Sequence, residues 1–311
     1  MNKKQLAILI ILSICIFLSS LMMQLSISAE STILNADFYS SFVQKHNLCN
    51  IPQNFVLLTI KNNTRELDEK TYQSLVKATS NTFSQEWTRE QVSGLINNLL
   101  AYLKNSSDEL DLRIDFRTQK SQLISQMLPV LPEATEDDII NKVLLVHIAE
   151  NLSDSAGIPD YLDLRYTSLI TDSGVLTYID AARTYYPYSK YLPFLLFSLF
   201  FISMLFLFKI SDCLKNTGYA LAISGLVVIV FVSYISGVLD SSITAQLSSY
   251  DELLAITGNN PKILASIFKN SILNVTNRIA IAFCLTGIFL FIVGIFTAKI
   301  RRKSRRISQQ S

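Results

Sequence analysis

The side chains in this sequence that could do chemistry are aspartates and arginines placed two residues apart. Asp111 precedes Arg113, and Asp163 precedes Arg165, within two copies of the tetrapeptide Leu-Asp-Leu-Arg. A carboxylate held beside a cation could serve acid–base catalysis. The charged residues alternate with apolar ones, however, which is the pattern of a strand with one buried face. We therefore predict that the two segments pair and that their charges form cross-strand ion pairs on the solvated face.

Other reactive residues are sparse. Adjacent acids such as Asp137 and Asp138 suit the positive end of a helix dipole, which accounts for them without catalysis. His46 and Cys49 supply at most two ligands of a metal site. The sequence has no nucleophile elbow, zinc-binding His pair or phosphate-binding glycine loop. We expect no catalytic residue, cofactor or metal, with an enzyme of unrecognised carboxylate chemistry as an alternative.

The elements around these residues are dominated by four apolar runs without a charged side chain. Each is close to the ~20 residues that a helix needs to cross a bilayer. The runs are Leu6 to Ile27, Leu192 to Phe208, Gly218 to Leu239 and Ile279 to Ala298. They predict four transmembrane helices.

Basic residues gather on one side of these runs. Ten lie in three short stretches with only Asp212 as an acidic residue, whereas the rest of the chain holds 17 basic and 24 acidic residues. The positive-inside rule therefore places both termini in the cytoplasm. The acidic remainder does not favour nucleic-acid binding. The basic residues are Lys3, Lys4, Lys209, Lys215, Lys299 and a cytoplasmic anchor of Arg301, Arg302, Lys303, Arg305 and Arg306.

The first run has two interpretations. A positive tip before an apolar stretch is also typical of a signal peptide, and Ser28 and Ala29 could precede a cleavage site. The stretch is longer than the ~7–15 residues of a cleaved signal, which favours a retained anchor. Residues 1–29 are therefore expected to be an N-terminal transmembrane anchor, with a signal peptide as the alternative.

Residues 30–190 are long enough for an exported domain with its own core. A capping box at Thr88 and Gln91 predicts a helix that starts there, and an upstream helix should bury Thr79 and Phe83. Further expected elements are a helix over about 135–151 and a strand over 55–60. The prediction is a helix-dominated α+β domain between the first two membrane helices.

The membrane region is expected to occupy residues 191–300, with a helical outer loop at 240–278 and a basic tail at 301–311. Small or compact residues at seven-residue and related spacings predict close helix packing in the last run. They are Ala280, Cys284, Gly287, Gly294 and Ala298. A tyrosine group ahead of the second run is typical of a membrane interface. It comprises Tyr185, Tyr186, Tyr188 and Tyr191.

Two resemblances extend this interpretation. The stretch from Trp87 to Gln91 and the segment Leu-Asp-Leu-Arg-Ile-Asp-Phe resemble a group of uncharacterised prokaryotic membrane proteins. That resemblance implies an anchor, a large outer domain and C-terminal helices, without an assigned activity. The order of elements also resembles permease subunits of the cell-division and macrolide-export ABC type. The short amino terminus and the short loop around Cys213 depart from that pattern.

We therefore expect an α-helical, multi-pass protein of the cell membrane, with residues of about 30–190 and 240–278 outside the cytoplasm. Its exported domain should serve a non-catalytic binding, scaffold or sensing role. The expected partners are the lipid bilayer and either another protein or a second copy through the membrane helices. A permease-like role in an ABC-type mechanotransmission or export complex is the main alternative.

Overall fold

The computed structural model describes residues 3–46, 48–50, 53–54, 57, 69–127, 160–166, 174–246 and 261–308. The chain forms two compact units. The first comprises Met1–Asn35, Thr184–Ala245 and Ser266–Ser311, and the second comprises Ala36–Arg183 and Gln246–Ala265.

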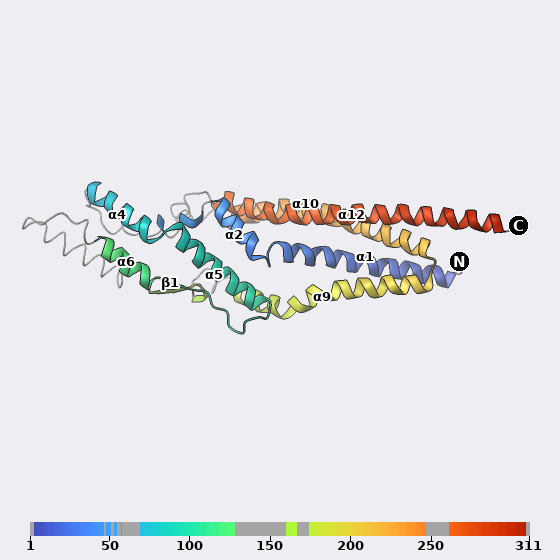
Figure 1. Ribbon diagram of the computed structural model, residues 1–311, viewed down its shortest axis with the longest axis horizontal. Helices are drawn as coiled ribbons and strands as arrows, with labels where there is room; N and C mark the ends of the chain where they lie inside the picture. The colour runs from blue at the N-terminus through green and yellow to red at the C-terminus, as the bar shows by residue number, and fades with distance from the viewer. Residues whose placement is uncertain are drawn as a thin grey trace, which may run out of the picture. The chain divides into compact units, whose positions relative to one another are not determined.

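The first unit is built from four helices that are long and apolar enough to cross a membrane (Figure 1). They are α1 (Lys3–Ser31), α9 (Val175–Leu207), α10 (Ile210–Gln246) and α12 (Pro261–Ser308). A backbone in lipid must satisfy its polar groups internally, and a continuous helix does so. The prediction of a mostly helical, multi-pass membrane protein is confirmed to this extent.

The predicted outer loop at 240–278 is wrong in its boundaries. Helix α10 continues to Gln246, and α12 begins at Pro261 and runs into the last apolar run without a break. Proline at the first helical position loses no needed hydrogen bond, which suits Pro261 as the start of α12. The apolar residues from Ile263 to Leu273 extend the membrane helix instead of forming a separate one.

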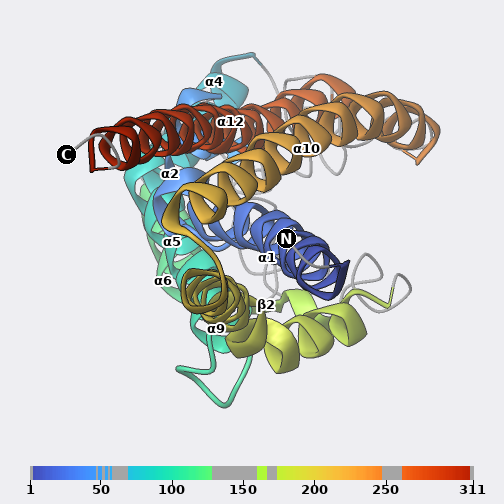
Figure 2. The same ribbon diagram turned by 90° about the vertical axis from the view of Figure 1, so that its right-hand side faces the viewer.

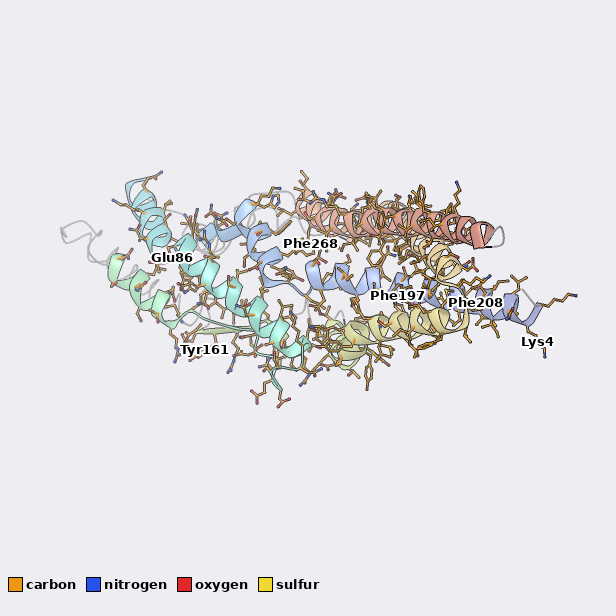
Figure 3. All side chains as sticks on the ribbon, turned by 45° about the vertical axis from the view of Figure 1, so that its right-hand side comes forward. Lys4, Glu86, Tyr161, Phe197, Phe208 and Phe268 are labelled. Atoms are coloured by element: carbon orange, nitrogen blue, oxygen red, sulfur yellow. The ribbon has the colours of Figure 1, made fainter. Side chains whose placement is uncertain are left out.

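The four helices alternate in direction. The starts of α1 and α10 and the ends of α9 and α12 lie at the same end of this unit (Figure 1). Only Phe208 and Lys209 separate α9 from α10. All three basic stretches of the sequence therefore meet at one end, where Lys4 is labelled in Figure 3.

Two apolar clusters hold the helices together. One joins Ile16 of α1, Met204 of α9 and Cys213 of α10, and the aromatic rings of Phe197 and Phe208 pack against it (Figure 3). The other joins Val228 and Val232 of α10 to Ala280 of α12, with Leu21 and Leu273 packed alongside. Every helix of the bundle therefore has a buried face in this unit.

The second unit contains shorter helices. These are α2 (Ala36–Lys45), the 3-10 turn η1 (Leu48–Asn50), α4 (Glu69–Thr82), α5 (Gln85–Leu103) and α6 (Arg117–Met127). The rings of Phe83, Trp87 and Phe116 pack together, with centroids 5.5–6.4 Å apart. The predicted burial of Thr79 and Phe83 is confirmed, since they are 0% and 1% exposed.

Helix α5 begins four residues before the predicted start. Its N-cap is Ser84, whose hydroxyl accepts a hydrogen bond from the Trp87 N–H at 3.2 Å. Thr88, which was predicted to cap the helix, is instead buried inside it, and its hydroxyl has no hydrogen-bond partner among the described residues. Ser84 precedes the Thr88 capping box by four residues, and the earlier cap satisfies the first free amides.

The two Leu-Asp-Leu-Arg segments pair as predicted. Strand β1 (Arg113–Asp115) runs antiparallel to β2 (Tyr161–Asp163), with Ile114 opposite Leu162. Each strand is only three residues long, because α6 begins at Arg117 and the 3-10 turn η3 (Leu164–Tyr166) follows β2. Among the described residues of this unit, the regular secondary structure is thus helical apart from one short ladder.

Several predictions fall outside the described residues. The helix over about 135–151 and most of the strand over 55–60 do so, and Leu57, which is described, is helical. Placing residues 30–190 in one exported α+β domain therefore remains a prediction.

Candidate functional site

Helices α10 and α12 approach each other backbone to backbone. A methyl group at Gly218 would lie 2.5 Å from the carbonyl oxygen of Gly287, and one at Gly225 would lie 2.5 Å from that of Ala280. Side chains larger than hydrogen cannot fit at such distances, so these glycines permit the contact. Among the predicted packing residues, Gly287, Gly294, Ala280 and Cys284 all face α10 here.

The register of this pair is constant over its length. Ser211 faces Gly294, Gly218 faces Gly287, and Gly225 faces Ala280. From each contact to the next, the residue number increases by seven on α10 and decreases by seven on α12. Seven-residue spacing keeps one seam facing the partner helix. Ala298, the remaining predicted packing residue, is partly exposed.

An ion pair continues this register at the end of the bundle away from the basic residues. The Nζ of Lys269 lies 2.5 Å from Oδ1 of Asp240 and donates to the carbonyl and hydroxyl oxygens of Ser236, both at 3.2 Å. The Lys269 side chain is 5% exposed, whereas that of Asp240 is 52% exposed. A buried ammonium needs such partners, so this pair fixes α10 against α12. Both residues lay in the predicted loop, which is why the sequence analysis missed the pair.

A polar seam joins α1 to these two helices, and we define it as Ser20, Gln24, Ser28, Ser224 and Thr276. The hydroxyls of Ser20 and Ser224 lie 2.5 Å apart, and the Gln24 amide donates to the Ser224 hydroxyl at 2.9 Å. Ser28 and Thr276 are also hydrogen-bonded. All five are buried, and Oε1 of Gln24 has no partner. The seam aligns α1 through hydrogen bonds that lipid cannot supply.

The sequence carried a signal for this seam. Ser20, Gln24, Ser28 and Thr32 recur every four residues inside or beside the first apolar run and therefore share one helix face. A pattern of charged residues in the apolar runs cannot reveal this seam, because its serine, glutamine and threonine side chains are uncharged.

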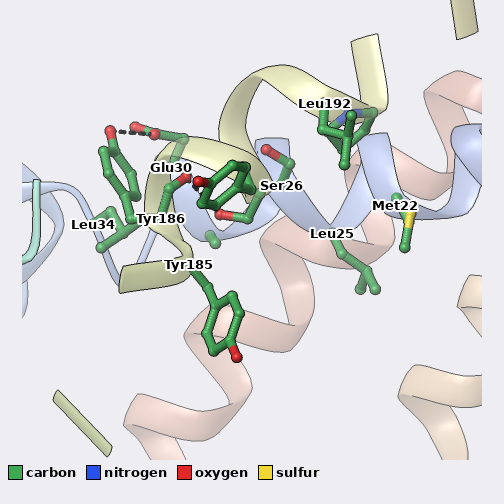
Figure 4. A pocket seen from close by; sticks show the side chains of 12 residues that line it. Met22, Leu25, Ser26, Glu30, Leu34, Tyr185, Tyr186 and Leu192 are labelled. Atoms are coloured by element: carbon green, nitrogen blue, oxygen red, sulfur yellow. Dashed lines mark hydrogen bonds between the residues drawn. The ribbon is translucent and has the colours of Figure 1, made fainter. Parts of the chain in front are cut away.

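Helices α1 and α9 leave a groove between them, with a volume of about 410 Å³ (Figure 4). Its walls include Met22 and Leu25 of α1 and Leu192 and Pro193 of α9. Three of the four predicted interface tyrosines line it: Tyr185, Tyr186 and Tyr188. Tyr191 is 65% exposed and does not line it.

A polar cap lies at one end of the groove, where Glu30 and Tyr186 line it and Lys190 contacts both residues. The Tyr186 hydroxyl donates to Oε1 of Glu30 at 2.8 Å, and Nζ of Lys190 donates to that hydroxyl at 3.2 Å. The ammonium of Lys190 lies 3.7 Å from the Glu30 carboxylate. Figure 4 shows Glu30 and Tyr186 at one end of the groove and Met22 and Leu192 toward the other.

The predicted basic anchor forms the last turns of α12. Arg301, Arg302, Lys303, Arg305 and Arg306 are helical, and so are Lys3, Lys4 and Lys215. The helix directions bring these stretches to one end of the bundle (Figure 2). A cluster of this sign suits an anionic lipid surface.

In the second unit, the end of α5 is latched to the beginning of α9. This latch consists of Tyr102, Asn105, Asp108, Asp180 and Arg183. The Tyr102 hydroxyl donates to Oδ1 of Asp180 at 2.7 Å. The Arg183 guanidinium donates to Oδ1 of Asn105 at 2.8 Å and to Asp108 at 3.1 Å, and it lies 4.2 Å above the Tyr102 ring.

The latch uses a carbonyl that a proline sets free. Pro187 lies inside α9 and has no N–H, so the Arg183 carbonyl loses its helical hydrogen bond. The Asn105 amide donates to that carbonyl at 3.1 Å. Asn105 sits just past α5 in the left-handed conformation, with φ 57°, and closes the helix end in a Schellman arrangement. The sequence analysis did not predict this contact, which joins residues far apart in the chain.

The aspartate–arginine pairs act locally instead of across the ladder. Asp111, Asp115 and Asp163 each accept hydrogen bonds from both the backbone N–H and the guanidinium of the arginine two residues later. The two strands do pair, but the predicted cross-strand ion pairs are wrong, because each aspartate side chain instead bonds the backbone and guanidinium of the arginine two residues later. These hydrogen bonds lower the pKa of all three carboxyl groups.

Within the described residues, no group of three or more His, Cys, Asp or Glu side chains could hold a metal ion. Comparisons with models of protein families, with curated proteins and with solved structures found no match.

Proposed function

We propose that the segment between α1 and α9 binds a protein or envelope partner, without catalysis, in a scaffold or sensing role. The latch is the observation that carries this proposal. It ties the end of α5 to the beginning of α9, a helix whose later residues form an apolar span. We further propose that residues 30–190 form one helix-dominated α+β domain.

The local charge pairs support a non-catalytic role. Asp111, Asp115 and Asp163 hold their own turns, and their lowered pKa values disfavour the protonated form that a general acid needs. The net negative charge outside the basic stretches also favours a protein or envelope partner over a nucleic acid.

The proposed topology places both termini in the cytoplasm, which leaves the segment between α1 and α9 and the α10–α12 connection outside. The basic end of the bundle supports this orientation. Cys213 is 0% exposed and would label poorly. We therefore choose the exposed positions Lys209→Cys and Ser106→Cys in a cysteine-free background. A membrane-impermeant maleimide should label Ser106→Cys in intact cells and Lys209→Cys only after permeabilisation; the reverse pattern contradicts the topology.

We also propose that α1 stays attached as a member of the bundle. Its removal would leave Ser224 and Thr276 without their partners on α1, inside an apolar environment. The intact mass of the purified protein should include residues 1–29. A mass that corresponds to a start near Glu30 would show cleavage.

Co-purification from mild detergent tests the role. Recovery of an envelope or membrane protein, at constant ratio to the full chain, supports the proposal. Recovery of a stoichiometric ATPase instead favours the permease-like alternative, although only two residues join α9 to α10. If the full chain showed catalytic turnover, and substitution of a single carboxylate abolished it, the protein would be an enzyme and both roles would be excluded.

A matched pair of variants tests the latch within this role. Asn105→Ala removes the hydrogen bonds to Arg183, whereas Asn98→Ala changes an exposed asparagine of the same helix. We expect Asn105→Ala to lower recovery of the partner while Asn98→Ala leaves it unchanged. Equal recovery with both variants would exclude the latch as the element that transmits binding.

A further inference from the structure

The groove between α1 and α9 has the dimensions of a ligand site. Its volume of about 410 Å³ lies within the range of ~300–1,000 Å³ found for small-molecule pockets. Small side chains on both helices leave space in the groove, since its lining includes Ser26 and Ala29 of α1 and Ser189 of α9. The groove therefore results from residue size on two helices whose ends are held elsewhere.

The walls of the groove are suited to a hydrocarbon chain. Met22 and Leu25 remain 55% and 50% exposed, and Leu192 remains 44% exposed, although all three are apolar. The two helices belong to candidate membrane spans, so in a bilayer such an exposed apolar surface would contact lipid acyl chains. An acyl chain that lies along the groove would cover it.

The polar cap selects the headgroup. A carboxylate, an ammonium and a phenol lie side by side in Glu30, Lys190 and Tyr186, and the side chains of Glu30 and Lys190 are 29% and 38% exposed. An anion alone would meet the Glu30 carboxylate, and a cation alone would meet Lys190. A zwitterionic group can place its phosphate on Lys190 and Tyr186 and its ammonium on Glu30.

We propose that this groove binds one phospholipid with a primary ammonium headgroup, of the phosphatidylethanolamine class, in the leaflet opposite the basic end. A primary ammonium donates hydrogen bonds to the Glu30 carboxylate, which a trimethylammonium cannot do. The exposed Tyr185 and Tyr188 rings flank the headgroup level, where aromatic residues are favoured. This inference depends on the membrane-spanning helices alone and not on the proposed role of the second unit.

The test measures lipid retention by the full chain. The protein is purified from nanodiscs of equal phosphatidylethanolamine, phosphatidylcholine and phosphatidylglycerol, and native mass spectrometry counts the lipids that remain bound. A second groove of about 400 Å³ between α1 and α10 has no charged residue in its lining and should add retention without headgroup preference. The wild-type protein should retain phosphatidylethanolamine in preference to the other two lipids.

Two substitutions distinguish lipid binding in the groove from lipid contacts elsewhere on the protein. Leu25→Trp fills the groove, whereas Leu18→Trp adds the same bulk to the same helix two turns away, at a similarly exposed leucine outside both grooves. We expect Leu25→Trp to lower phosphatidylethanolamine retention about tenfold and Leu18→Trp to leave it unchanged. Ala29→Leu fills the groove with a smaller side chain and should act like Leu25→Trp if that variant is poorly folded.

Glu30→Gln tests the headgroup. Loss of a charged hydrogen bond should lower the preference for phosphatidylethanolamine over phosphatidylcholine about tenfold. Equal retention by the Leu18→Trp and groove-filling variants would overturn the proposed site. Equal retention of the three lipids by the wild-type protein would overturn the headgroup assignment.

Discussion

Two ion pairs, one from each unit, join very different parts of the chain. In the membrane bundle, Lys269 and Asp240 come from different helices, and the lysine side chain is 5% exposed. In the second unit, Arg113 pairs with Asp111 two residues away, and both side chains are well exposed, at 57% and 43%. The first pair carries information about helix packing, whereas the second stabilises only a turn.

The difference follows from the surroundings. A charge removed from water must find a partner, so its position constrains which helices meet. An exposed pair is screened by water and contributes little to stability. Buried polar groups in the bundle should therefore be sensitive to substitution, and the exposed aspartate–arginine pairs of the second unit, such as Asp111 and Arg113, should be tolerant of it.

The largest expected effect comes from the glycine contact that sets the bundle register. Gly287→Ala places a methyl group against the backbone of Gly218 and Ala222, so α10 and α12 must separate. Overpacking of this kind costs about 1–3 kcal/mol. Thermal unfolding of the bundle in detergent, followed by helical circular dichroism, should show it.

Gly237→Ala is the matched control, because nothing lies within 4 Å of a methyl group there. It should leave the bundle as stable as the wild-type protein, or more so. If both alanine variants behave alike, the close contact of α10 and α12 does not hold the bundle.

The next effect comes from the buried ammonium. Asp240→Ala removes the carboxylate partner of Lys269, whose side chain stays buried with only Ser236 as a described acceptor. Loss of a hydrogen bond to a charged group costs about 1.5–3 kcal/mol, and because the Asp240 side chain is 52% exposed, the loss should lie at the lower end and below that of Gly287→Ala. The thermal unfolding midpoint of Asp240→Ala should therefore fall. The midpoint of Asp240→Asn should fall less, because asparagine keeps an acceptor oxygen. An unchanged midpoint in Asp240→Ala would show that the Lys269–Asp240 pair does not stabilise the packing of α10 and α12.

A smaller effect is expected from the polar seam. Ser224→Ala removes the hydroxyl that contacts Ser20 and Gln24 and should cost about 1 kcal/mol, typical of intramembrane hydrogen bonds. Ser233→Ala removes an exposed hydroxyl of the same helix that bonds only its own backbone. Guanidinium or detergent denaturation of the two variants compares them directly, and equal stability would show that the seam contributes nothing.

The smallest effect concerns acid sensitivity of the second unit. Because the folded state lowers the pKa of Asp163, this pair contributes stability above the unfolded pKa of about 3.9 and loses it as pH falls through the folded pKa. Trp87, the single tryptophan, packs on Phe116 beside β1 and reports on this unit. Its fluorescence should show acid unfolding at a slightly higher pH in Asp163→Asn than in the wild-type protein. Unfolding of Asp163→Asn at a lower pH than the wild-type protein would contradict a stabilising role of the Asp163 carboxylate.

Local patterns in the sequence were sufficient for much of the fold. The four apolar runs predicted the membrane helices, and the alternation around Ile114 and Leu162 predicted the strand pair. These features depend on neighbours within a few residues. Helix boundaries were less predictable. The N-cap of α5 is Ser84 and not Thr88, and α12 includes about half of the predicted outer loop.

What the sequence by itself determined is therefore the number of membrane helices, the sorting of basic residues and the candidate packing positions on α12. Only the tertiary structure decided which groups meet across helices: Lys269 with Asp240, Gln24 with Ser224, and Asn105 with the carbonyl freed by Pro187. Apolar periodicity specifies that a helix face is buried, but it does not specify the partner. The partner is fixed by where small residues allow backbones to approach and where buried polar groups find hydrogen bonds.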